Sequence, residues 1–544
     1  MMINNRQYKA TKKSKGPNGF VNFCKCVFFY VILATMTSSF DTIEYRPCQY
    51  DEAIVELEFP ITEDVIALQE RIDEIFARYS SYKFRYGLKV ISLDKPQVIY
   101  EANHTDSFIP ASNLKVLTTA AGYHFLSEDY RWNTQFYVNF DGNLYIKPSG
   151  DPTWNDKYYG VKLNYLFRAI ADSLASHPNL RINNVILERG SFDDFKMDYF
   201  WKPNNRIQTY SARPSHFAFN NNTVNIKVEP TSPGHLAELT IFPVHAGFEI
   251  INNVHTVAYR TSQPLHIEAD SLMNSISVSG SIYSKSRPQF RGIAIPRPDD
   301  YALVVFREKF EEFEIAYEGE MYYEHVSERD FRRARFEPLF SLPSVRIFDV
   351  VSDINKWSNN FHANQLFLTI GENERHVWQT ENIIKEWLVS NNIPIHDLKL
   401  FDGSGLSHFN QISPDVLVNV LKFVHSQPYF EEYKSTLPIS GVDGTLRRHF
   451  NSYTLKGEVH AKTGYVLGAR GLTGYLRTAD GELLAFSFLM NRPSSNLGNF
   501  HEIAEQIFNE LVLFERVDYG LEDKGIEVWN NALGYKNWGN KLAN

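Results

Sequence analysis

Cysteine is scarce in this chain of 544 residues, which contains only Cys24, Cys26 and Cys48. Three cysteines exclude a disulfide-built scaffold and a cysteine-rich zinc module. The 17 histidines form no His-Glu-x-x-His pattern, so that type of zinc site is excluded too. Positive charge is also in short supply. The 55 basic and 64 acidic residues leave a formal net charge of −9, and such a chain lacks the basic face that non-specific nucleic-acid binding needs.

The apolar run near the N-terminus, Val27 to Met36, is too short for a membrane span, which needs about 20 residues. Basic residues precede the run, Thr37-Ser38-Ser39 follows it, and no acidic residue occurs before Asp41. This order predicts a secretory signal peptide over residues 1–39, with an uncleaved N-terminal anchor as the alternative. Cleavage would leave Cys48 alone, so we expect no intrachain disulfide.

Apolar side chains are plentiful, because 43% of the residues are hydrophobic and 14% are aromatic. This composition excludes global disorder, and the length predicts two or three domains. Helical periodicity is found over residues 51–79, and strands are expected over 86–91 and 97–101. A second helix is expected after Pro110, with an apolar stripe formed by Leu114, Leu117, Ala121 and Phe125.

The pattern changes at about residue 134. From there to residue 336, short alternating runs separated by turn residues predict a β-rich region, interrupted by one helical stretch over 163–176. Helical patterns return after Ile347. The remaining expected elements are helices over 361–370 and 382–388 and a hairpin of 472–477 with 483–491 around Ala479-Asp480-Gly481.

Ser112-Asn113-Leu114-Lys115 is a Ser-x-x-Lys sequence in the first turn of the helix expected after Pro110. Lys115 then lies on the same helix face as Ser112, within reach of its hydroxyl. A serine hydroxyl becomes a good nucleophile when a base takes its proton, and lysine can be that base when burial or a nearby cation lowers its pKa. A second copy, Ser80-Ser81-Tyr82-Lys83, stands where a helix ends. A single Ser-x-x-Lys is more often a solvated helix face.

Two further short motifs follow in the sequence. Ser358-Asn359-Asn360 is a Ser-x-Asn before a helix, although residues 390–392 and 494–496 match that loose pattern too. Lys462-Thr463-Gly464 ends a strand-like run and offers a second cation, a hydroxyl for a substrate carboxylate, and room for a substrate backbone. Ser-x-x-Lys, Ser-x-Asn and Lys-Thr-Gly in this order are typical of the serine acyl-transferases that include penicillin-binding proteins and β-lactamases.

Over about residues 55–515 the chain resembles the class C low-molecular-mass penicillin-binding proteins, the DacB-like D-alanyl-D-alanine carboxypeptidase/endopeptidase family. The interval from Ser112 to Ser358 is 358 − 112 = 246 residues, and a long insertion at this point is similar to that family's. Further stretches that resemble it are Pro110–Ala121, Gly150–Thr153, Lys356–Phe361, Asp402–Ser407, Gly441–Leu446 and Lys462–Tyr475.

The resemblance implies an α/β (α+β) β-lactamase/transpeptidase-like domain, split in sequence, with β-rich domains inserted between the first and second catalytic motifs. The expected division is a signal peptide over 1–39, the catalytic domain over 40–133 and 337–515, the inserted domains over 134–336, and a C-terminal tail over 516–544.

The implied activity is that of a serine-type D-alanyl-D-alanine carboxypeptidase that cleaves peptidoglycan stem peptides. D,D-endopeptidase action on cross-links stays open. The implied roles are Ser112 as nucleophile, Lys115 as base, and Ser358 as proton relay. Substrate would be held by Asn360, Lys462, Thr463 and Gly464, with the backbone N–H groups of Ser112 and Tyr465 as oxyanion hole. Tyr465 departs from the family's pattern, in which a small residue or threonine follows the glycine.

No metal or organic cofactor and no nucleic-acid partner is expected. β-Lactam antibiotics are expected as covalent inhibitors, and the expected location is the periplasm or cell envelope of a bacterium, where peripheral membrane or cell-wall association is compatible with the sequence. The alternatives are a β-lactamase or esterase on the same scaffold and an inactive cell-wall-binding homologue. Penicillin labelling separates them, because an inactive binder forms no covalent adduct and an efficient β-lactamase forms only a transient one.

Overall fold

The computed structural model describes residues 61–155, 164–192, 195–203, 206–242, 249–260, 263–269, 275–493 and 495–517. The expected signal peptide, Cys48 and nearly all of the expected C-terminal tail lie outside these ranges. None of the helices in the described ranges has the length and apolar character that a membrane span requires.

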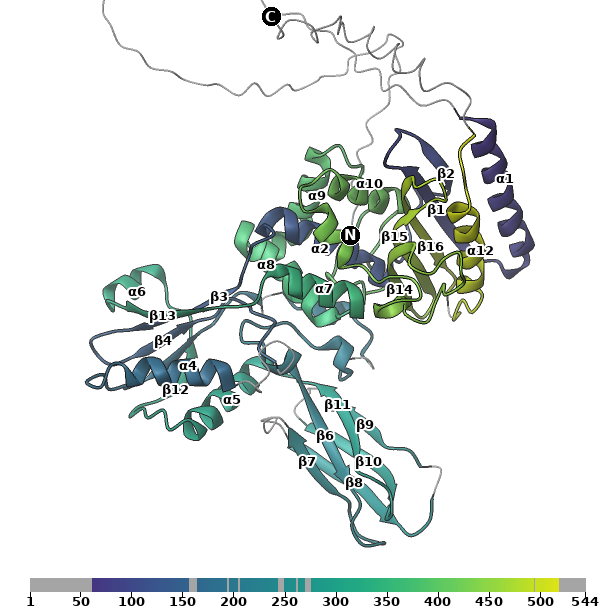
Figure 1. Ribbon diagram of the computed structural model, residues 1–544. Helices are drawn as coiled ribbons and strands as arrows, with labels where there is room; N and C mark the ends of the chain where they lie inside the picture. Colours follow the sequence, from purple (N-terminus) through teal and green to yellow (C-terminus); the bar gives the residue numbers. More distant parts are fainter. Residues whose placement is uncertain are drawn as a thin grey trace, which may run out of the picture. The chain divides into compact units, whose positions relative to one another are not determined.

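Five antiparallel strands form a central sheet in the order β14-β15-β16-β1-β2 (Figure 1). Strand β1 pairs with β16, which joins the beginning of the described chain to its end. Every residue of β16 is buried, so both faces of the sheet must be covered. The strand bounds are Arg85–Ser92 for β1, Val98–Ala102 for β2, Val459–Val466 for β14, Ala469–Arg477 for β15 and Leu483–Asn491 for β16.

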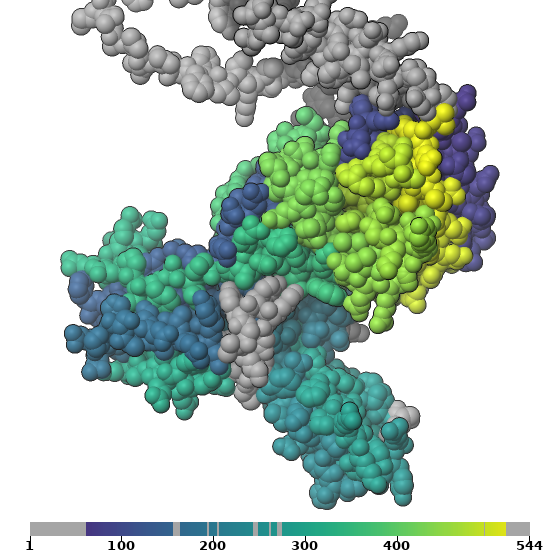
Figure 2. Space-filling model, viewed as in Figure 1, coloured from purple at the N-terminus to yellow at the C-terminus, as the bar shows by residue number. Residues whose placement is uncertain are grey.

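Helices cover the two faces of this sheet. On one face lie α1, Glu63–Arg78, and α12, Phe500–Val512, whose apolar sides share a buried cluster with the sheet. Helix α1 buries Val65, Leu68 and Ile72, at the three- and four-residue steps that the sequence shows. Figure 2 shows the same neighbourhood as purple N-terminal atoms against yellow C-terminal atoms. Against the other face lies α10, Pro414–His425.

Helix α2, Leu114–Leu126, lies at the centre of a helical cluster. Every residue from Leu114 to Tyr123 is buried, so the expected apolar stripe was too narrow. The threonines of α2 tolerate burial because their hydroxyls bond to carbonyls, as Thr119 does to the Lys115 carbonyl at 2.7 Å. The surrounding helices are α7, Ile347–Trp357; α8, Asn360–Glu374; α9, Thr380–Ser390; α10; and α11, Phe430–Ser435.

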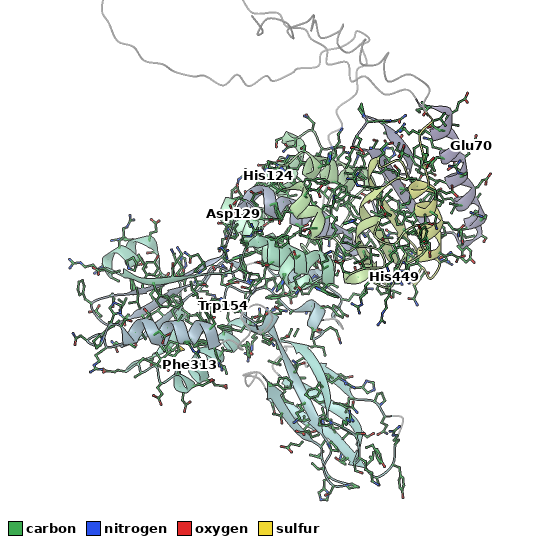
Figure 3. All side chains as sticks on the ribbon, in the orientation of Figure 1. Glu70, His124, Asp129, Trp154, Phe313 and His449 are labelled. Carbon is green, nitrogen blue, oxygen red and sulfur yellow. The ribbon has the colours of Figure 1, made fainter. Side chains whose placement is uncertain are left out.

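Between the first and second motifs lies a second five-stranded sheet, in the order β12-β5-β4-β3-β13. Its strands are β3, Asn133–Val138; β4, Leu144–Lys147; β5, Val185–Glu188; β12, Met321–Glu324; and β13, Glu337–Pro343. Helix α4, Asn164–Ala175, is the helix expected over 163–176. Trp154 lies in this inserted part, as does Phe313 at the end of α5 (Figure 3).

The expectation of a single helix in this region was wrong, because the structure adds α5, Pro298–Glu312, and α6, Glu328–Arg333. Helix α5 buries Tyr301, Val305 and Phe306 against the inserted sheet. Its start is a proline at the first helical position, where the missing N–H costs nothing. A Pro-Asp-Asp sequence also suits a turn, so it does not by itself mark a helix.

A smaller β-module is nested inside this insertion. It consists of two sheets, β11-β6-β7 and β8-β10-β9. Strands β6 and β11 pair with each other, and the Ile295 N–H donates to the Asn222 carbonyl at 2.8 Å, so the module leaves and re-enters the chain at one place. The bounds are β6, Thr223–Glu229; β7, Glu238–Phe242; β8, Glu249–Val257; β9, His266–Ala269; β10, Ser275–Tyr283; and β11, Gln289–Ala294.

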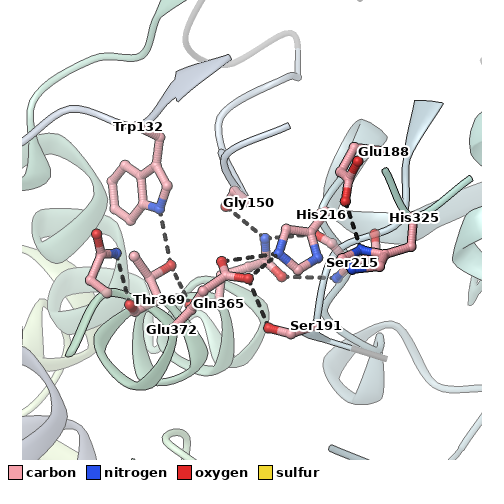
Figure 4. A network of polar contacts seen from close by, with 11 residues as sticks. Trp132, Gly150, Glu188, Ser191, Ser215, His216, His325, Gln365, Thr369 and Glu372 are labelled. Carbon is pink, nitrogen blue, oxygen red and sulfur yellow. Dashed lines mark hydrogen bonds and ion pairs between the residues drawn. The ribbon is translucent and has the colours of Figure 1, made fainter. Parts of the chain in front are cut away.

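The chain between β5 and β6 returns to the helical cluster around α2. Phe192, Met197 and Trp201 belong to the buried cluster that surrounds α2. Gln365 of α8 uses its whole amide on this segment and on Gly150, since its nitrogen donates to the Gly150 and Ser215 carbonyls and its oxygen accepts from the Ser215 N–H. Figure 4 shows this network, in which Glu372 of α8 also bonds to Ser191 and His216.

Candidate active site

The serine of the first motif lies in a 3-10 turn, η2, Ala111–Asn113, directly before α2. Ala111 has a φ of +48°, a left-handed conformation that lets the chain turn sharply into the helix. Lys115 is the second residue of α2, and its Nζ lies 2.8 Å from Ser112 Oγ. The three-residue spacing therefore brings the two side chains into hydrogen-bond contact, as the sequence predicted.

Lys115 is fully buried, and two other atoms bond to its Nζ. These are Asn360 Oδ1 at 2.7 Å and the Ser404 carbonyl at 2.6 Å. Both are pure acceptors, because Asn360 uses its amide nitrogen to donate to the Tyr210 carbonyl at 2.9 Å. A neutral Lys115 donates its two N–H groups to these acceptors, which leaves its lone pair for the Ser112 hydroxyl.

Burial lowers the pKa of Lys115 to about 7, while the Asp402 carboxylate acts in the opposite direction. Burial also holds the pKa of Lys462 well below its usual range, and the nearby charge of Lys115 lowers it further. Two buried lysines in one site disfavour a second positive charge. A neutral lysine is therefore accessible beside Ser112 near neutral pH.

The Ser-x-Asn motif forms the junction of α7 and α8. Ser358 ends α7 in a left-handed conformation with a φ of +60°. Asn359 caps α8 by accepting from the His362 N–H at 3.1 Å, and its own nitrogen donates to Asp353 at 2.6 Å. This junction directs Asn360 toward Lys115, while Ser358 Oγ accepts from Lys462 Nζ at 3.0 Å.

The Lys-Thr-Gly motif lies within β14, at an edge of the central sheet. A Cβ on Gly464 would stand 2.2 Å from Asn113 Nδ2, so the turn that carries Ser112 occupies that space. Gly464 thus permits the strand to lie against η2, a reason that the sequence did not reveal. Thr463 Oγ1 donates to Thr445 Oγ1 at 2.8 Å.

The backbone of Tyr465 has the orientation that an oxyanion donor needs. The Ala461 N–H donates to the Pro438 carbonyl and the Ser440 N–H donates to the Val459 carbonyl, so odd-numbered residues of β14 direct their backbone groups away from β15. Strand alternation extends this orientation to Thr463 and Tyr465. The side chain of Tyr465 is 52% exposed, with the Arg470 guanidinium 4.0 Å from the centre of its ring.

The loop Asp402–Ser407 forms the wall behind Lys115. The Ser404 carbonyl accepts from Lys115 Nζ, and the Gly403 carbonyl accepts from Thr118 Oγ1. Gly405 has a φ of +79°, and a Cβ there would stand 1.8 Å from the Ala111 carbonyl oxygen. The sequence left open whether this Gly-Ser-rich loop is functional or a structural turn that supports the Ser-x-Asn segment, and it did not reveal that the loop's backbone bonds to Lys115.

Three more residues contact the site. Thr445 belongs to the stretch Gly441–Leu446 named above, although its own contact was not predicted. Thr445 bonds to Thr463, Tyr210 accepts from Asn360, and Trp201 bonds to Asp402. Tyr210 and Trp201 come from the inserted region and had no motif that could reveal them. Trp357, which directly precedes Ser358, is 55% exposed, with Arg447 over its ring.

The structure separates the other motif copies from the site. Ser80–Tyr82 is an exposed 3-10 turn, η1, after α1, and Ser80 Oγ donates to the Ala77 carbonyl. Ser390 ends α9 with its hydroxyl on the Trp387 carbonyl. Ser494 lies outside the described residues.

Comparisons with known proteins identify the family of the chain. The model of the D-Ala-D-Ala carboxypeptidase 3 (S13) family matches residues 68–509. A D-alanyl-D-alanine carboxypeptidase of Actinomadura sp. (strain R39) is 26% identical over 445 residues, which are 78% of this chain and 81% of that protein. The D-alanyl-D-alanine carboxypeptidase DacB of Haemophilus influenzae is 24% identical over 423 residues, which are 74% of this chain and 85% of that protein.

A solved structure shows the same fold. The crystal structure of penicillin binding protein 4 (dacB) from Haemophilus influenzae aligns with a TM-score of 0.67 at 22% identity, over 83% of this chain and 100% of that one. A second crystal structure of that protein, in complex with a β-lactam, aligns with a TM-score of 0.65 at 20% identity, over 84% of this chain and 100% of that one.

Proposed function

Because the chain belongs to the D-Ala-D-Ala carboxypeptidase 3 (S13) family, we propose that its activity as a serine-type D-alanyl-D-alanine carboxypeptidase is carried by Ser112, Lys115, Ser358 and the Lys-Thr-Gly strand. The family and the α/β fold predicted from sequence are confirmed. The observation that carries the proposal is the buried, lowered-pKa Lys115 with its Nζ 2.8 Å from Ser112 Oγ.

Acylation begins when Ser112 Oγ attacks the carbonyl carbon of the bond between two D-alanines. Lys115, neutral, takes the hydroxyl proton as the new C–O bond forms. The oxygen of the tetrahedral intermediate accepts from the backbone N–H groups of Ser112 and Tyr465. The intermediate collapses by releasing the terminal D-alanine, whose nitrogen receives the proton that Lys115 took, relayed through Ser358 Oγ, the group that accepts from Lys462 Nζ. Water then hydrolyses the ester and restores the Ser112 hydroxyl.

Substrate binding prepares the base. The terminal carboxylate of the peptide meets Lys462 and the Thr463–Thr445 hydroxyl pair. A carboxylate at this point favours the charged form of Lys462, and a charged Lys462 disfavours a charge on Lys115. The correct substrate therefore shifts Lys115 toward its neutral, basic form. Asn360 keeps its oxygen on Lys115, and its nitrogen exchanges the Tyr210 carbonyl for a substrate amide carbonyl.

The same groups account for β-lactam inhibition. A β-lactam carries a carboxylate and a strained amide, and Ser112 opens that amide to form an ester. The leaving nitrogen stays attached to the bound molecule, so it blocks the path of water. We expect a stable covalent adduct on Ser112 with a fluorescent penicillin, identified by mass spectrometry of the labelled peptide. An adduct on another residue contradicts the assignment of Ser112, and rapid loss of the adduct favours the β-lactamase alternative.

The substrate class is tested by product analysis. Purified muropeptide pentapeptides should lose one D-alanine, and the matched tetrapeptides, which lack the terminal residue, should remain intact. A protein that labels with penicillin and releases no D-alanine contradicts the carboxypeptidase assignment.

The second part of the proposal is that the protein also cleaves cross-linked peptides. We assign to the nested β-module a role in the cleavage of these larger substrates. Its adjacent ends permit a clean deletion, in which a glycine linker joins Asn222 to Ile295. The deletion variant should keep penicillin acylation and lose cleavage of cross-linked dimers. A folded variant that cleaves dimers as fast as the parent contradicts this role.

Export is proposed from the sequence alone. The mature chain should begin near Phe40 in the periplasm or cell envelope, where peptidoglycan is found. N-terminal sequencing of protein isolated from cells tests this. An intact N-terminus on membrane-bound protein supports the uncleaved-anchor alternative.

A further inference from the structure

A tryptophan of the inserted region bonds to the loop that holds the catalytic lysine. The Trp201 indole N–H donates to Asp402 Oδ2 at 2.9 Å, and both side chains are buried. Trp201 follows η4, Met197–Phe200, and the ring of Phe200 lies 4.7 Å from that of Phe401. Residues 200 and 201 therefore lie against residues 401 and 402.

Asp402 organises the loop through its acceptor atoms. Asp402 Oδ1 accepts from the backbone N–H groups of Ser404 and Gly405, at 3.0 and 2.6 Å, and from Asn410 Nδ2 at 3.2 Å. Asp402 Oδ2 accepts from the Ser407 N–H at 2.7 Å and from Trp201. These partners are all donors, so Asp402 stands as a carboxylate. The loop it organises presents the Ser404 carbonyl to Lys115 Nζ.

We infer that Trp201 is a positioning residue for acylation. Its indole N–H holds the Asp402 carboxylate in place, and this fixes the position of the Ser404 carbonyl. The same hydrogen bond offsets part of the negative charge that Asp402 directs at Lys115. The inference rests on the proposed role of Lys115 as base. It gives the inserted region a part in the chemistry without contact to substrate.

The sign of the effect follows from the charges around Lys115. In the described part of the chain, these are Asp402 on its loop and Lys462 on β14, while η2 and α8 contribute the neutral Ser112 and Asn360. Asp402 raises the pKa of Lys115 against the larger effect of burial. Without the indole N–H, less of the carboxylate's negative charge is offset, so Asp402 raises the pKa of Lys115 further. His408, which directly follows this loop, is also titratable. Burial and the positive charge of Lys202 both lower the pKa of its imidazole.

The test is the pH dependence of acylation by a chromogenic penicillin in the full-length Trp201→Phe variant. In a plot of acylation rate against pH, the midpoint of the rise should move to higher pH by about half a unit. At a fixed pH below the midpoint, this shift makes acylation about threefold slower. The matched control is Phe200→Leu, which removes ring packing from the same segment and keeps the N–H. It should leave the midpoint in place even if it lowers thermal stability.

The midpoint does not depend on how much protein is folded, so partial loss of stability does not obscure it. If Trp201→Phe gives no soluble protein, 3-benzothienylalanine at residue 201 replaces the N–H by sulfur in a ring of the same shape, and it should give the same shift. An unchanged midpoint in the variant that folds, or a shift to lower pH, overturns the inference. The Lys115→Arg variant separates this from the proposed function, since near-normal acylation in that variant refutes the base itself.

Discussion

The chain contains Ser-x-x-Lys twice, and the two copies have opposite surroundings. At Ser80, the hydroxyl turns back to the Ala77 carbonyl, and Lys83 is exposed in a left-handed conformation. At Ser112, the hydroxyl contacts Lys115 Nζ, and the lysine is fully buried among acceptors from α8 and the Asp402 loop. The Ser-x-x-Lys spacing is the same in both copies, and at Ser112 burial lowers the pKa of the lysine.

The motif by itself fixes only the spacing between the serine and the lysine. Burial of the lysine lowers its pKa and so produces the neutral amine that the reaction needs. Three residues of helix bring a hydroxyl and an amine together in any sequence. An exposed amine near neutral pH carries a proton and cannot accept another. Helix α8, the Asp402 loop and β14 remove water from Lys115, whereas Lys83 is exposed.

The largest effect is expected from the two serines. Ser112→Ala should abolish covalent penicillin labelling and D-alanine release, because no other group occupies the nucleophile's place. Ser80→Ala should leave both unchanged and alter the free energy of unfolding by less than about 0.5 kcal/mol, as for most exposed sites. Labelling of the purified variants on a gel measures this, and an adduct in the Ser112→Ala protein refutes the mechanism.

The two lysines should differ by several orders of magnitude. Arginine keeps the charge and cannot be deprotonated at working pH. Lys115→Arg should therefore slow acylation by about 10²- to 10⁴-fold, the usual contribution of a general base. Lys83→Arg is the matched control and should acylate at the parent rate. Stopped-flow acylation with a chromogenic penicillin gives both rates, and equal rates in the two variants would show that Lys115 is not the base.

The parent enzyme should show a pH dependence that an exposed lysine could not produce. The pKa of Lys115 is lowered to about 7, so its neutral form dominates above that pH. Below it, the acylation rate should fall about tenfold per pH unit. Single-turnover rates between pH 5 and 9 measure the midpoint. A rate that keeps rising toward pH 10 would mean that Lys115 has an ordinary pKa.

The smallest effect is expected at the contact between β14 and the nucleophile's turn. Gly464→Ala places a Cβ 2.2 Å from Asn113 Nδ2, so the turn must shift. We expect a loss of about 1–3 kcal/mol in the free energy of unfolding, as for overpacked cores, together with slower acylation. Gly498→Ala is the control, because its Cβ meets no atom within 4 Å. Urea unfolding measures both, and equal stabilities would remove the packing argument.

Much of the fold followed from periodicity. The helix near residue 63 matches its prediction because apolar residues recur along it at three- and four-residue steps. The helix near residue 360 and the hairpin that ends at Asn491 also lie where they were predicted, although Phe361–Gly371 and β16 are buried throughout. Helix α5 was missed because a proline-aspartate start suits a turn as well as a helix. Helix α2 was predicted with one apolar stripe, whereas every residue from Leu114 to Tyr123 is buried. The periodicity of a sequence does not show how many neighbouring elements cover a helix.

By itself the sequence determined the order of the three motifs, the length of the insertion and the helical spacing of Ser112 and Lys115. These are local or linear properties, and they carried the family resemblance. Only the tertiary structure decided which Ser-x-x-Lys copy loses its water, that Gly464 makes room for Asn113, and that Trp201 bonds to Asp402 from 201 residues away in sequence. The reason is physical: the pKa of a lysine depends on the groups packed around it, and those groups come from segments that the sequence separates by hundreds of residues.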